Sequence, residues 1–357
     1  MSAHVLLPSA FPMAKALNSV VGVDIGRYSL KAVLLQRRKD RLAVTHYGSY
    51  IPEEFARDAD ELGRQLKALF KDMGGAAKNC VVSVSSPDAL IRIIEQPETP
   101  TYILRDALRL NGMALLNQDV KSLVIDCDRI PAANPRPLEP GMVARHKYLV
   151  GGVPRDEVEK VSAAVTATAG NVHALQLSPV GVYNAFEVAR PDVFNDGAFF
   201  IVDIGHINST MLVGMRKELI LVRQIDFGGG SLMDSLCGLS GDHREAVISA
   251  LDHEDEVMIE YTRVNMNTLT REISSSIGFI EHHHEAAIGR VFVTGGPARS
   301  RVFLKLMGEE LGIPCEAWSA VAQCDVEISG NRRAEFEREA LDLNVACGVA
   351  APFLSAN

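Results

Sequence analysis

Apolar runs separated by short polar turns divide this chain into predicted strands and helices. Residues 20–35 have the sequence VVGVDIGRYSLKAVLL, in which an apolar run ends in Asp-Ile-Gly and a second apolar run follows a short polar loop. Residues 199–214, with the sequence FFIVDIGHINSTMLVG, repeat this pattern about half a chain later. Two apolar segments joined by a tight turn with Asp and Gly predict a β-hairpin at each place.

The residues that follow the first hairpin predict a β-β-β-α-β order. Residues 41–50 resume a strand pattern, and residues 56–73 place their leucines on one helical face. The Gly-Gly pair at 74–75 ends this helix, and residues 80–84 form a buried strand. A separate α-β unit is then predicted at 98–177, before the chain returns to the first domain.

The inserted unit is expected to contain helices, strands and a proline-rich loop. Because proline cannot donate a hydrogen bond to a strand ladder, the loop at 131–145 is predicted to be a linker or a contact surface. The helices of the unit are predicted at 102–116 and 155–169, and its strands at 120–130, 147–153 and 172–177.

The second half of the chain contains the second hairpin and two further glycine turns. A connecting helix at 178–190 leads into the hairpin. A strand at 219–227 ends in the Gly-Gly-Gly turn of residues 228–230, and a strand at 290–294 ends in Gly295-Gly296-Pro297. Further helices are predicted at 231–239, 267–285, 300–311 and 340–354, and the last of these is rich in small residues.

These elements divide the chain of 357 residues, which is long enough for two domains, into lobes, an insert and a tail. The tail is predicted to be flexible and not a signal peptide, because it has one lysine and two prolines interrupt its apolar residues. The predicted limits are 1–19 for the tail, 20–97 with 178–198 for the first lobe, 98–177 for the insert, and 199–357 for the second lobe with 236–275 as its helical part.

Composition and charge exclude several classes of protein. A formal net charge of −9 argues against broad electrostatic binding to nucleic acid or anionic lipid. The cysteines include no C-x-x-C pair, which indicates reduced thiols of a cytosolic protein. No apolar run approaches the ~18 residues of a membrane span, so none is predicted. The acidic residues of 240–260 are predicted to form a solvated helical face.

The turns of the two hairpins contain residue types that bind a phosphate. Glycine lets the backbone approach an oxyanion, and successive N–H groups in such a turn form an anion-binding concavity. Asp24 and Asp203, each at the end of a buried strand, could hold the waters of a phosphate-bound Mg²⁺. A single Asp-Gly turn is usually only a turn, but two copies favour a phosphate site. Four nearby side chains could add hydroxyl or ammonium donors: Ser29, Lys31, Ser209 and Thr210.

Some of these signals have a simpler alternative. The pattern is not the dinucleotide fingerprint, since there is no G-x-G-x-x-G and a strand follows each hairpin turn. Lys31, on the returning strand, points to solvent in the simpler interpretation and to a phosphate in the functional one. At Gly295-Gly296 a strand is followed by two glycines and then by a helix. The two glycines could let a flat nucleoside ring lie against bare backbone, or they could only allow the helix to pack closely on the strand.

The order of these motifs resembles that of the actin-like ATPase superfamily. Within it, the stretches LRDALRLNGMALLNQDVKSLVIDCDRI and KYLVGGVPRDEVEKVSAAVTATAGNVHALQLSPVGVYNAFE are similar to the PilM family, cytoplasmic FtsA-like proteins of type IV pilus and type II secretion systems. This resemblance implies an α/β, actin-like ATPase (ribonuclease H-like) bilobed fold with a small inserted α-β subdomain. It also implies ATP with Mg²⁺ and little hydrolysis, so the chain's status as an enzyme is left open.

The resemblance assigns site residues by motif. Glu272, on a later helix, matches an acidic position that faces the ribose in relatives. Arg27-Tyr28 stands where small residues are usual in relatives, and His206-Ile207 occupies a tip that is often Gly, Ala or Glu. Bulky side chains there could narrow the phosphate site, although Arg27 could equally pair with a phosphate oxygen. The full set of candidate nucleotide contacts is Asp24, Gly26, Arg27, Tyr28, Ser29, Lys31, Asp203, Gly205, His206, Asn208, Ser209, Thr210, Gly228, Gly229, Glu272, Gly295, Gly296 and Pro297.

Two functions follow as alternatives. The first is a cytoplasmic, ATP-binding assembly protein that recruits the N-terminal cytoplasmic peptide of a PilN-like inner-membrane protein and other platform components. It would lie at the inner membrane through that partner, with no span of its own. The second is a small-molecule kinase of the same superfamily. The sequence favours the first, because no acidic residue in a separate substrate motif offers the base that a kinase needs.

Overall fold

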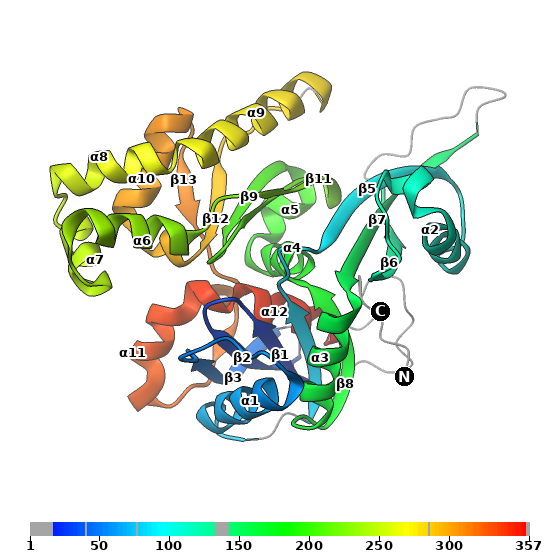
Figure 1. The fold of residues 1–357 in the computed structure, drawn as a ribbon, viewed down its shortest axis with the longest axis horizontal. Helices are drawn as coiled ribbons and strands as arrows, with labels where there is room; N and C mark the ends of the chain where they lie inside the picture. Colours follow the sequence, from blue (N-terminus) through cyan, green and yellow to red (C-terminus); the bar gives the residue numbers. More distant parts are fainter. Residues whose placement is uncertain (1–16, 40, 76–77, 133–142, 285, 355–357) are drawn as a thin grey trace. The chain divides into compact units, whose positions relative to one another are not determined.

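Two units make up the chain in the computed structural model, which describes residues 17–39, 41–75, 78–132, 143–284 and 286–354 (Figure 1). The first unit is Met1–Pro191 with Ala320–Asn357, and the second is Asp192–Ser319. The predictions for a tail at 1–19 and a proline-rich loop at 131–145 fall largely outside the described residues. Among the helices of the described part, none has the length and apolar character to cross a bilayer.

A six-stranded sheet with the order β14-β3-β2-β1-β4-β8 is the centre of the first unit. Strands β1, β2 and β3 pair antiparallel, whereas β4 lies parallel to β1 and β8 parallel to β4. With α1 between β3 and β4, this order confirms the predicted β-β-β-α-β arrangement. The strands are β1 (Ser19–Ile25), β2 (Leu30–Arg38), β3 (Arg41–Tyr50), β4 (Asn79–Val84), β8 (Asn171–Leu177) and β14 (Asp325–Val326).

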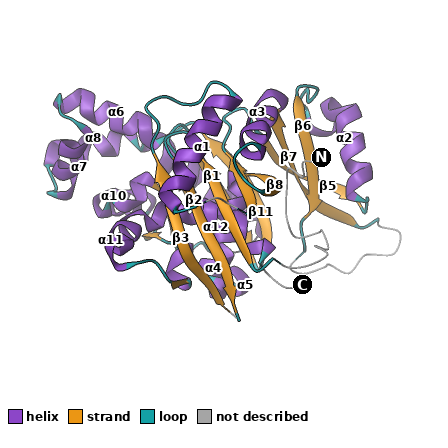
Figure 2. Ribbon diagram, turned by 90° about the horizontal axis from the view of Figure 1, so that it is seen from below, coloured by secondary structure: helices purple, strands orange, loops and turns teal. Residues whose placement is uncertain are grey.

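Helices cover both faces of this sheet (Figure 2). Helix α1 packs on β2 and β3, while α12 packs on β1 and β4 from the other face and contacts α4. The Asp58 side chain caps α1 by accepting a hydrogen bond from the Glu61 N–H, and Gly74 ends the helix at φ +94°. The helices are α1 (Ala59–Met73), α3 (Arg155–Thr166), α4 (Ser178–Ala189), α11 (Gly330–Glu339) and α12 (Asn344–Ala350).

Helix α12 packs so closely on α4 and β1 that their backbones come into contact. A Cβ atom on Gly348 would lie 1.8 Å from the carbonyl oxygen of Gly181 in α4, and one on Gly22 in β1 would lie 1.8 Å from the carbonyl oxygen of Ala346. This packing is why residues 320–357 group with the first unit, so their predicted place in the second lobe is wrong. The predicted helix at 340–354 is also divided, into η4 (Ala340–Leu343), α12 and η5 (Ala351–Phe353).

The insert is a three-stranded antiparallel sheet, ordered β5-β7-β6, with α2 against it. Its limits differ from the predicted 98–177. It includes β5, which the sequence did not predict, whereas β8 pairs with β4 and α3 packs on α1, so both belong to the main body of the unit. The insert therefore spans about 90–154, with β5 (Leu90–Pro97), α2 (Thr101–Leu116), β6 (Leu123–Arg129) and β7 (Arg145–Pro154).

The insert buries a carboxyl group that should make its stability depend on pH. Asp128 on β6 is 3% exposed, its Oδ2 has no hydrogen-bond partner among the described residues, and burial raises its pKa to about 6. Between the ordinary pKa and about 6, the folded protein holds a proton that the unfolded chain releases, so stability falls as pH rises through this window. We expect the free energy of unfolding to be lower at pH 7.5 than at pH 5 by about 1.4 kcal/mol from this group, measured by denaturation at the two pH values.

Asp128→Asn should remove this part of the pH dependence, whereas Asp106→Asn, at an exposed position of α2, should keep it. An Asp128→Asn variant with the full wild-type dependence would contradict the expectation.

The second unit repeats the central strand arrangement of the first. Its sheet has the order β11-β10-β9-β12-β13, with β9, β10 and β11 antiparallel and with β12 parallel to β9. As predicted, the acidic residues of 240–260 are exposed, here on and around α7 and α8. The strands are β9 (Ala198–Ile204), β10 (Ser209–Met215), β11 (Glu218–Ile225), β12 (Val291–Gly295) and β13 (Cys315–Ala317). The helices are α5 (Pro191–Asp196), α6 (Gly229–Ser240), α7 (Arg244–Asp252), α8 (Glu256–Asn265), α9 (Asn267–His284) and α10 (Arg301–Leu311).

Candidate functional site

Asp24 lies at the end of β1, in line with polar residues on both neighbouring strands. In the strand register it is opposite Lys31 on β2 and Ser83 on β4. It is 5% exposed, and burial raises the pKa of its carboxyl group, although the Lys31 ammonium group and a hydrogen bond with Ser83 act in the opposite direction. A buried carboxylate of this kind favours a bound cation.

Lys31 points toward Asp24 and not into solvent. Its Nζ lies 3.7 Å from Asp24 Oδ2, and its side chain is 18% exposed. The solvent interpretation of Lys31 is therefore wrong, because the returning strand places the lysine directly opposite the aspartate. As a phosphate contact, Lys31 stays a prediction.

The polar row continues to Gln176, which the sequence analysis missed. Gln176 on β8 is in register with Ser83 and is 2% exposed, and its Oε1 has no hydrogen-bond partner among the described residues. The Ser83 hydroxyl lies 2.7 Å from that of Ser178 at the start of α4. The row thus ends in a buried oxygen that can still accept a hydrogen bond. It could have been found only by aligning the ends of the three parallel strands.

The tip of the first hairpin is held by Arg27. Its Nη2 lies 2.6 Å from Glu157 Oε1 on α3, its Nε donates to the Ser85 carbonyl oxygen at 3.0 Å, and its guanidinium lies 5.3 Å from the ring centre of Phe55. Of the two roles considered for Arg27, pairing with a phosphate would compete with Glu157. The neighbouring Tyr28 is 39% exposed.

Two small residues close the same turn. A Cβ atom on Gly26 would lie 2.9 Å from the Ser29 carbonyl oxygen, so a larger residue would open the turn. Ser29 itself is 5% exposed.

The second hairpin repeats this arrangement inside the second unit. Asp203, at the end of β9, is in register with Thr210 on β10 and with Thr294 on β12, just as Asp24 is with Lys31 and Ser83. The Gly205 N–H donates to the Asn208 carbonyl oxygen at 3.1 Å, which closes the turn. Each unit therefore combines an aspartate at a strand end, a hydroxyl residue on the adjacent parallel strand, and a glycine turn.

The Gly228–Gly230 turn supports the second hairpin from behind. The Gly229 N–H donates to the Gly205 carbonyl oxygen at 2.8 Å, and the Gly230 N–H donates to the His206 carbonyl oxygen at 2.9 Å. A Cβ atom on Gly228 would lie 2.2 Å from the His206 carbonyl oxygen. These N–H groups already have acceptors, so the geometry gives the turn a supporting role, and direct nucleotide contact by Gly228 and Gly229 stays a prediction.

Two polar side chains of the second hairpin face the protein interior. The Ser209 hydroxyl is fully buried and donates to the Phe227 carbonyl oxygen at 2.7 Å, so it cannot donate to a phosphate at the same time. The His206 ring lies against Gly230, and burial, together with the positive charge of Arg244, lowers its pKa. His206 is therefore predominantly neutral at pH 7.

The late glycine turn lies beside the second hairpin. Gly295 has φ +94°, and a Cβ atom there would lie 2.2 Å from the Ile204 carbonyl oxygen, so this position requires glycine for packing. Pro297 approaches Gly229, whereas a Cβ atom on Gly296 would meet no atom within 4 Å. The bare backbone that a flat ring needs is thus at Gly296. Glu272 on α9 lies 3.5 Å from Arg223 on β11, and its proposed ribose contact stays a prediction.

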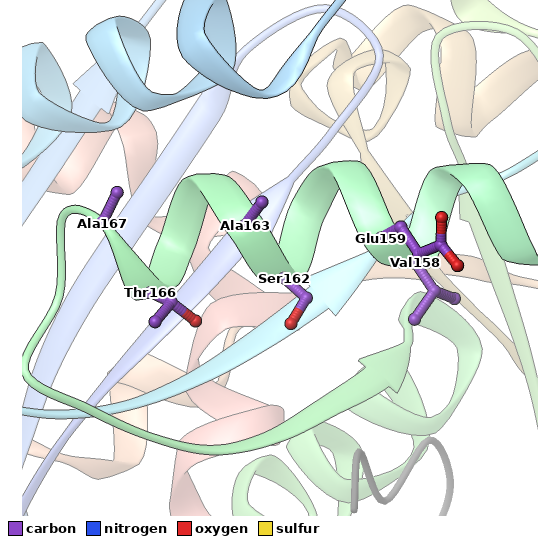
Figure 3. Close-up of a pocket in the computed structure, with 6 residues that line it drawn as sticks. All are labelled: Val158, Glu159, Ser162, Ala163, Thr166 and Ala167. Carbon is purple, nitrogen blue, oxygen red and sulfur yellow. The ribbon is translucent and has the colours of Figure 1, made fainter. Parts of the chain in front are cut away.

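A separate hollow of about 500 Å³ runs along α3 (Figure 3). It contains one charged side chain and none of the predicted nucleotide contacts, and ligand sites usually bring several polar groups together. It is lined by Val158, Glu159, Ser162, Ala163, Thr166 and Ala167.

Comparisons with known proteins concern the family and the fold of the chain. The sequence model of the family described as type IV pilus assembly protein PilM matches residues 22–352. A solved PilM–PilN type IV pilus biogenesis complex is similar, with a TM-score of 0.78 and 18% sequence identity over 96% of this chain and 100% of that chain. The ethanolamine utilization protein EutJ from Carboxydothermus hydrogenoformans is similar, with a TM-score of 0.54 and 14% identity over 98% of this chain and 93% of that chain.

At these identities the solved structures show the fold alone. The fold is the actin-like ATPase fold predicted from the sequence. The comparison with curated proteins found no match.

Proposed function

The chain belongs to the PilM family of type IV pilus assembly proteins, and we propose that it binds ATP with Mg²⁺ and recruits a PilN-type membrane protein. The observation that supports nucleotide binding best is the repeated arrangement of a strand-end aspartate, a hydroxyl residue and a glycine turn in both units. The family match also favours an assembly role over the kinase alternative.

The polar row that begins at Asp24 fits a hydrated magnesium ion. Mg²⁺ prefers oxygen ligands and usually keeps several of its waters. The buried Asp24 carboxylate and the unpartnered Gln176 Oε1 are oxygen acceptors on registered strands. The described residues contain no group of three or more His, Cys, Asp or Glu side chains that could hold a metal directly, so we assign contact through water.

Each hairpin would have a defined part in binding. In the first unit, the Gly26 turn would bring backbone N–H groups to a phosphate, and Asp24 would accept hydrogen bonds from the waters of Mg²⁺. In the second unit, the Gly205 turn and Asp203 have the same chemistry to offer. The bound ion would supply charge neutralisation between the triphosphate and these carboxylates. The open backbone at Gly296 would accept the flat face of the base.

We expect Asp24→Ala and Asp203→Ala each to weaken ATP binding in the presence of Mg²⁺ by about 1–3 kcal/mol, the usual loss when a charged hydrogen-bond partner is removed. Isothermal titration calorimetry measures this change. Asp252→Ala, at an exposed position of α7, is the matched control and should bind as wild type does.

A second variant separates binding from folding. Asp24→Asn keeps the shape of the side chain, and because burial already disfavours the charged form of Asp24, we expect its thermal unfolding to stay close to that of wild type. Equal ATP affinity in wild type, Asp24→Asn and Asp203→Ala would refute the proposed nucleotide site.

The insert is the proposed docking unit for the partner. Its helix α2 exposes apolar side chains, with Tyr102 64%, Leu110 88% and Met113 59% exposed, which is typical of an interaction surface. The similar solved structure is described as a PilM–PilN complex, which supports a PilN-type partner for this chain. Through the cytoplasmic N-terminal peptide of that partner, the protein would lie on the cytoplasmic side of the inner membrane, beside other platform components.

A further inference from the structure

Helices α6 and α8 of the second unit contact each other (Figure 1). An apolar groove lies on the surface that they form. It has a volume of about 350 Å³. Four apolar side chains and two glutamates line it: Leu239, Val257, Tyr261, Val264, Glu256 and Glu260. None of these residues belongs to the candidate nucleotide site.

Most of the apolar lining lies outside the core of the unit, although Tyr261 also packs against the edge of that core. Helix α8 already buries Met258 and Thr262. Its groove residues lie on another face at i, i+4 and i+7 spacing, and Val257 is 62% and Val264 is 61% exposed. Exposed apolar side chains at both ends of such a stripe are typical of an interaction site.

The edge of the groove is negatively charged. Glu256 and Glu260 lie in the lining, and the acidic residues of the preceding turn extend the negative surface. Arg263, the basic residue on the same helix, lies 2.9 Å from Glu309, also contacts Glu310, and lies 4.0 Å from Glu260. Three carboxylates thus share one guanidinium group, and the edge keeps a net negative charge. An occupant of the groove must therefore combine apolar anchors with positive charge.

We propose that this groove binds an amphipathic, basic helix of a partner protein. The stripe from Val257 to Val264 covers about 10 Å along the α8 axis, which matches about two turns of a partner helix with apolar residues at the same spacing. Lysine or arginine residues beside those anchors would face Glu256 and Glu260. Both sides of the groove are helices, so an extended peptide would find no strand there with which to form backbone hydrogen bonds, and a helical occupant fits better.

The probe is a fluorescein-labelled peptide of leucine and lysine, about 18 residues long, with its leucines on one helical face. Fluorescence anisotropy with the full chain measures its affinity against a peptide of scrambled order. We expect the helical peptide to bind at least about tenfold more tightly than the scrambled one.

Variants then locate the binding site. Val257→Asp places a charge among the anchors and should weaken binding about tenfold or more, while Ile51→Asp, the same kind of change at an exposed position directly after β3, should leave it unchanged. Glu256→Gln with Glu260→Gln should weaken binding at about 50 mM salt but not at about 500 mM. All of these side chains are exposed, so the variants should fold.

Three outcomes would overturn the proposal: equal affinity for the two peptides, equal affinity in wild type and Val257→Asp, or an equal loss in Ile51→Asp. A dimer in sedimentation experiments that Val257→Asp abolishes would overturn it in favour of a second copy of this chain as the occupant.

Discussion

Replacement of Gly348 by alanine is expected to lower the free energy of unfolding by about 3 kcal/mol or more, at the upper end of the usual cost of overpacking. The added Cβ atom would lie 1.8 Å from the Gly181 carbonyl oxygen and 2.6 Å from the Ala185 nitrogen, both backbone atoms of α4. Backbone atoms inside a helix cannot rotate away as a side chain can, so α12 would have to move off α4. Urea denaturation followed by far-ultraviolet circular dichroism measures the loss.

Gly278→Ala is the matched control, since Gly278 also lies inside a helix, α9, but its Cβ position has no atom within 4 Å. This substitution should raise stability by up to about 1 kcal/mol, because alanine favours the helix more than glycine does. Opposite signs for the two substitutions would attribute the effect to contact with α4. A Gly348→Ala variant as stable as wild type would show that α12 does not approach α4 this closely.

Removal of residues 90–154 is expected to abolish binding of a PilN-type N-terminal peptide while ATP binding continues. The insert can be removed as a piece because its three strands pair only with one another in the described structure and its apolar residues form a cluster of their own with α2. A short glycine-serine linker would join residue 89 to residue 155. Pull-down with the immobilised peptide, and calorimetry with ATP and Mg²⁺, measure the two activities.

The limits of this deletion are important. A deletion of 98–177, as the sequence alone suggested, would remove β8 and the α3 helix that packs on α1, and the six-stranded sheet would lose an edge. With the limits at 90–154, loss of peptide binding with retained ATP binding would assign the partner site to the insert. Full peptide binding by the shortened protein would place that site elsewhere.

Local patterns in the sequence were sufficient to predict the central elements. Both Asp-Gly hairpins, the strand before Gly295 and the helix after it form as predicted, because each is determined by a short apolar run and a turn residue. Asp24 and Asp203 lie at strand ends for the same reason. The resemblance to a known family added the fold, which local patterns alone would not have identified.

Pairing over long distances could not be predicted in this way. Nothing near Gln176 in the sequence indicates that it shares a row with Asp24, since parallel strands far apart in the chain are aligned by packing. The insert boundary was misplaced for the same reason. The sequence of β8 does not show whether it pairs with the strands of the insert or with β4 of the central sheet. It also explains the interpretation of Arg27, whose partner Glu157 is 130 residues away.

The Arg27–Glu157 pair connects the first hairpin to the base of the insert. Glu157 lies in the first turn of α3, and α3 begins directly after β7 of the insert. A phosphate that drew the guanidinium of Arg27 toward itself would leave the Glu157 carboxylate without its counter-ion, only a few residues from the root of the insert. If a phosphate binds the first hairpin as proposed, the loss of the Arg27–Glu157 pair would therefore change the contacts at the base of the insert.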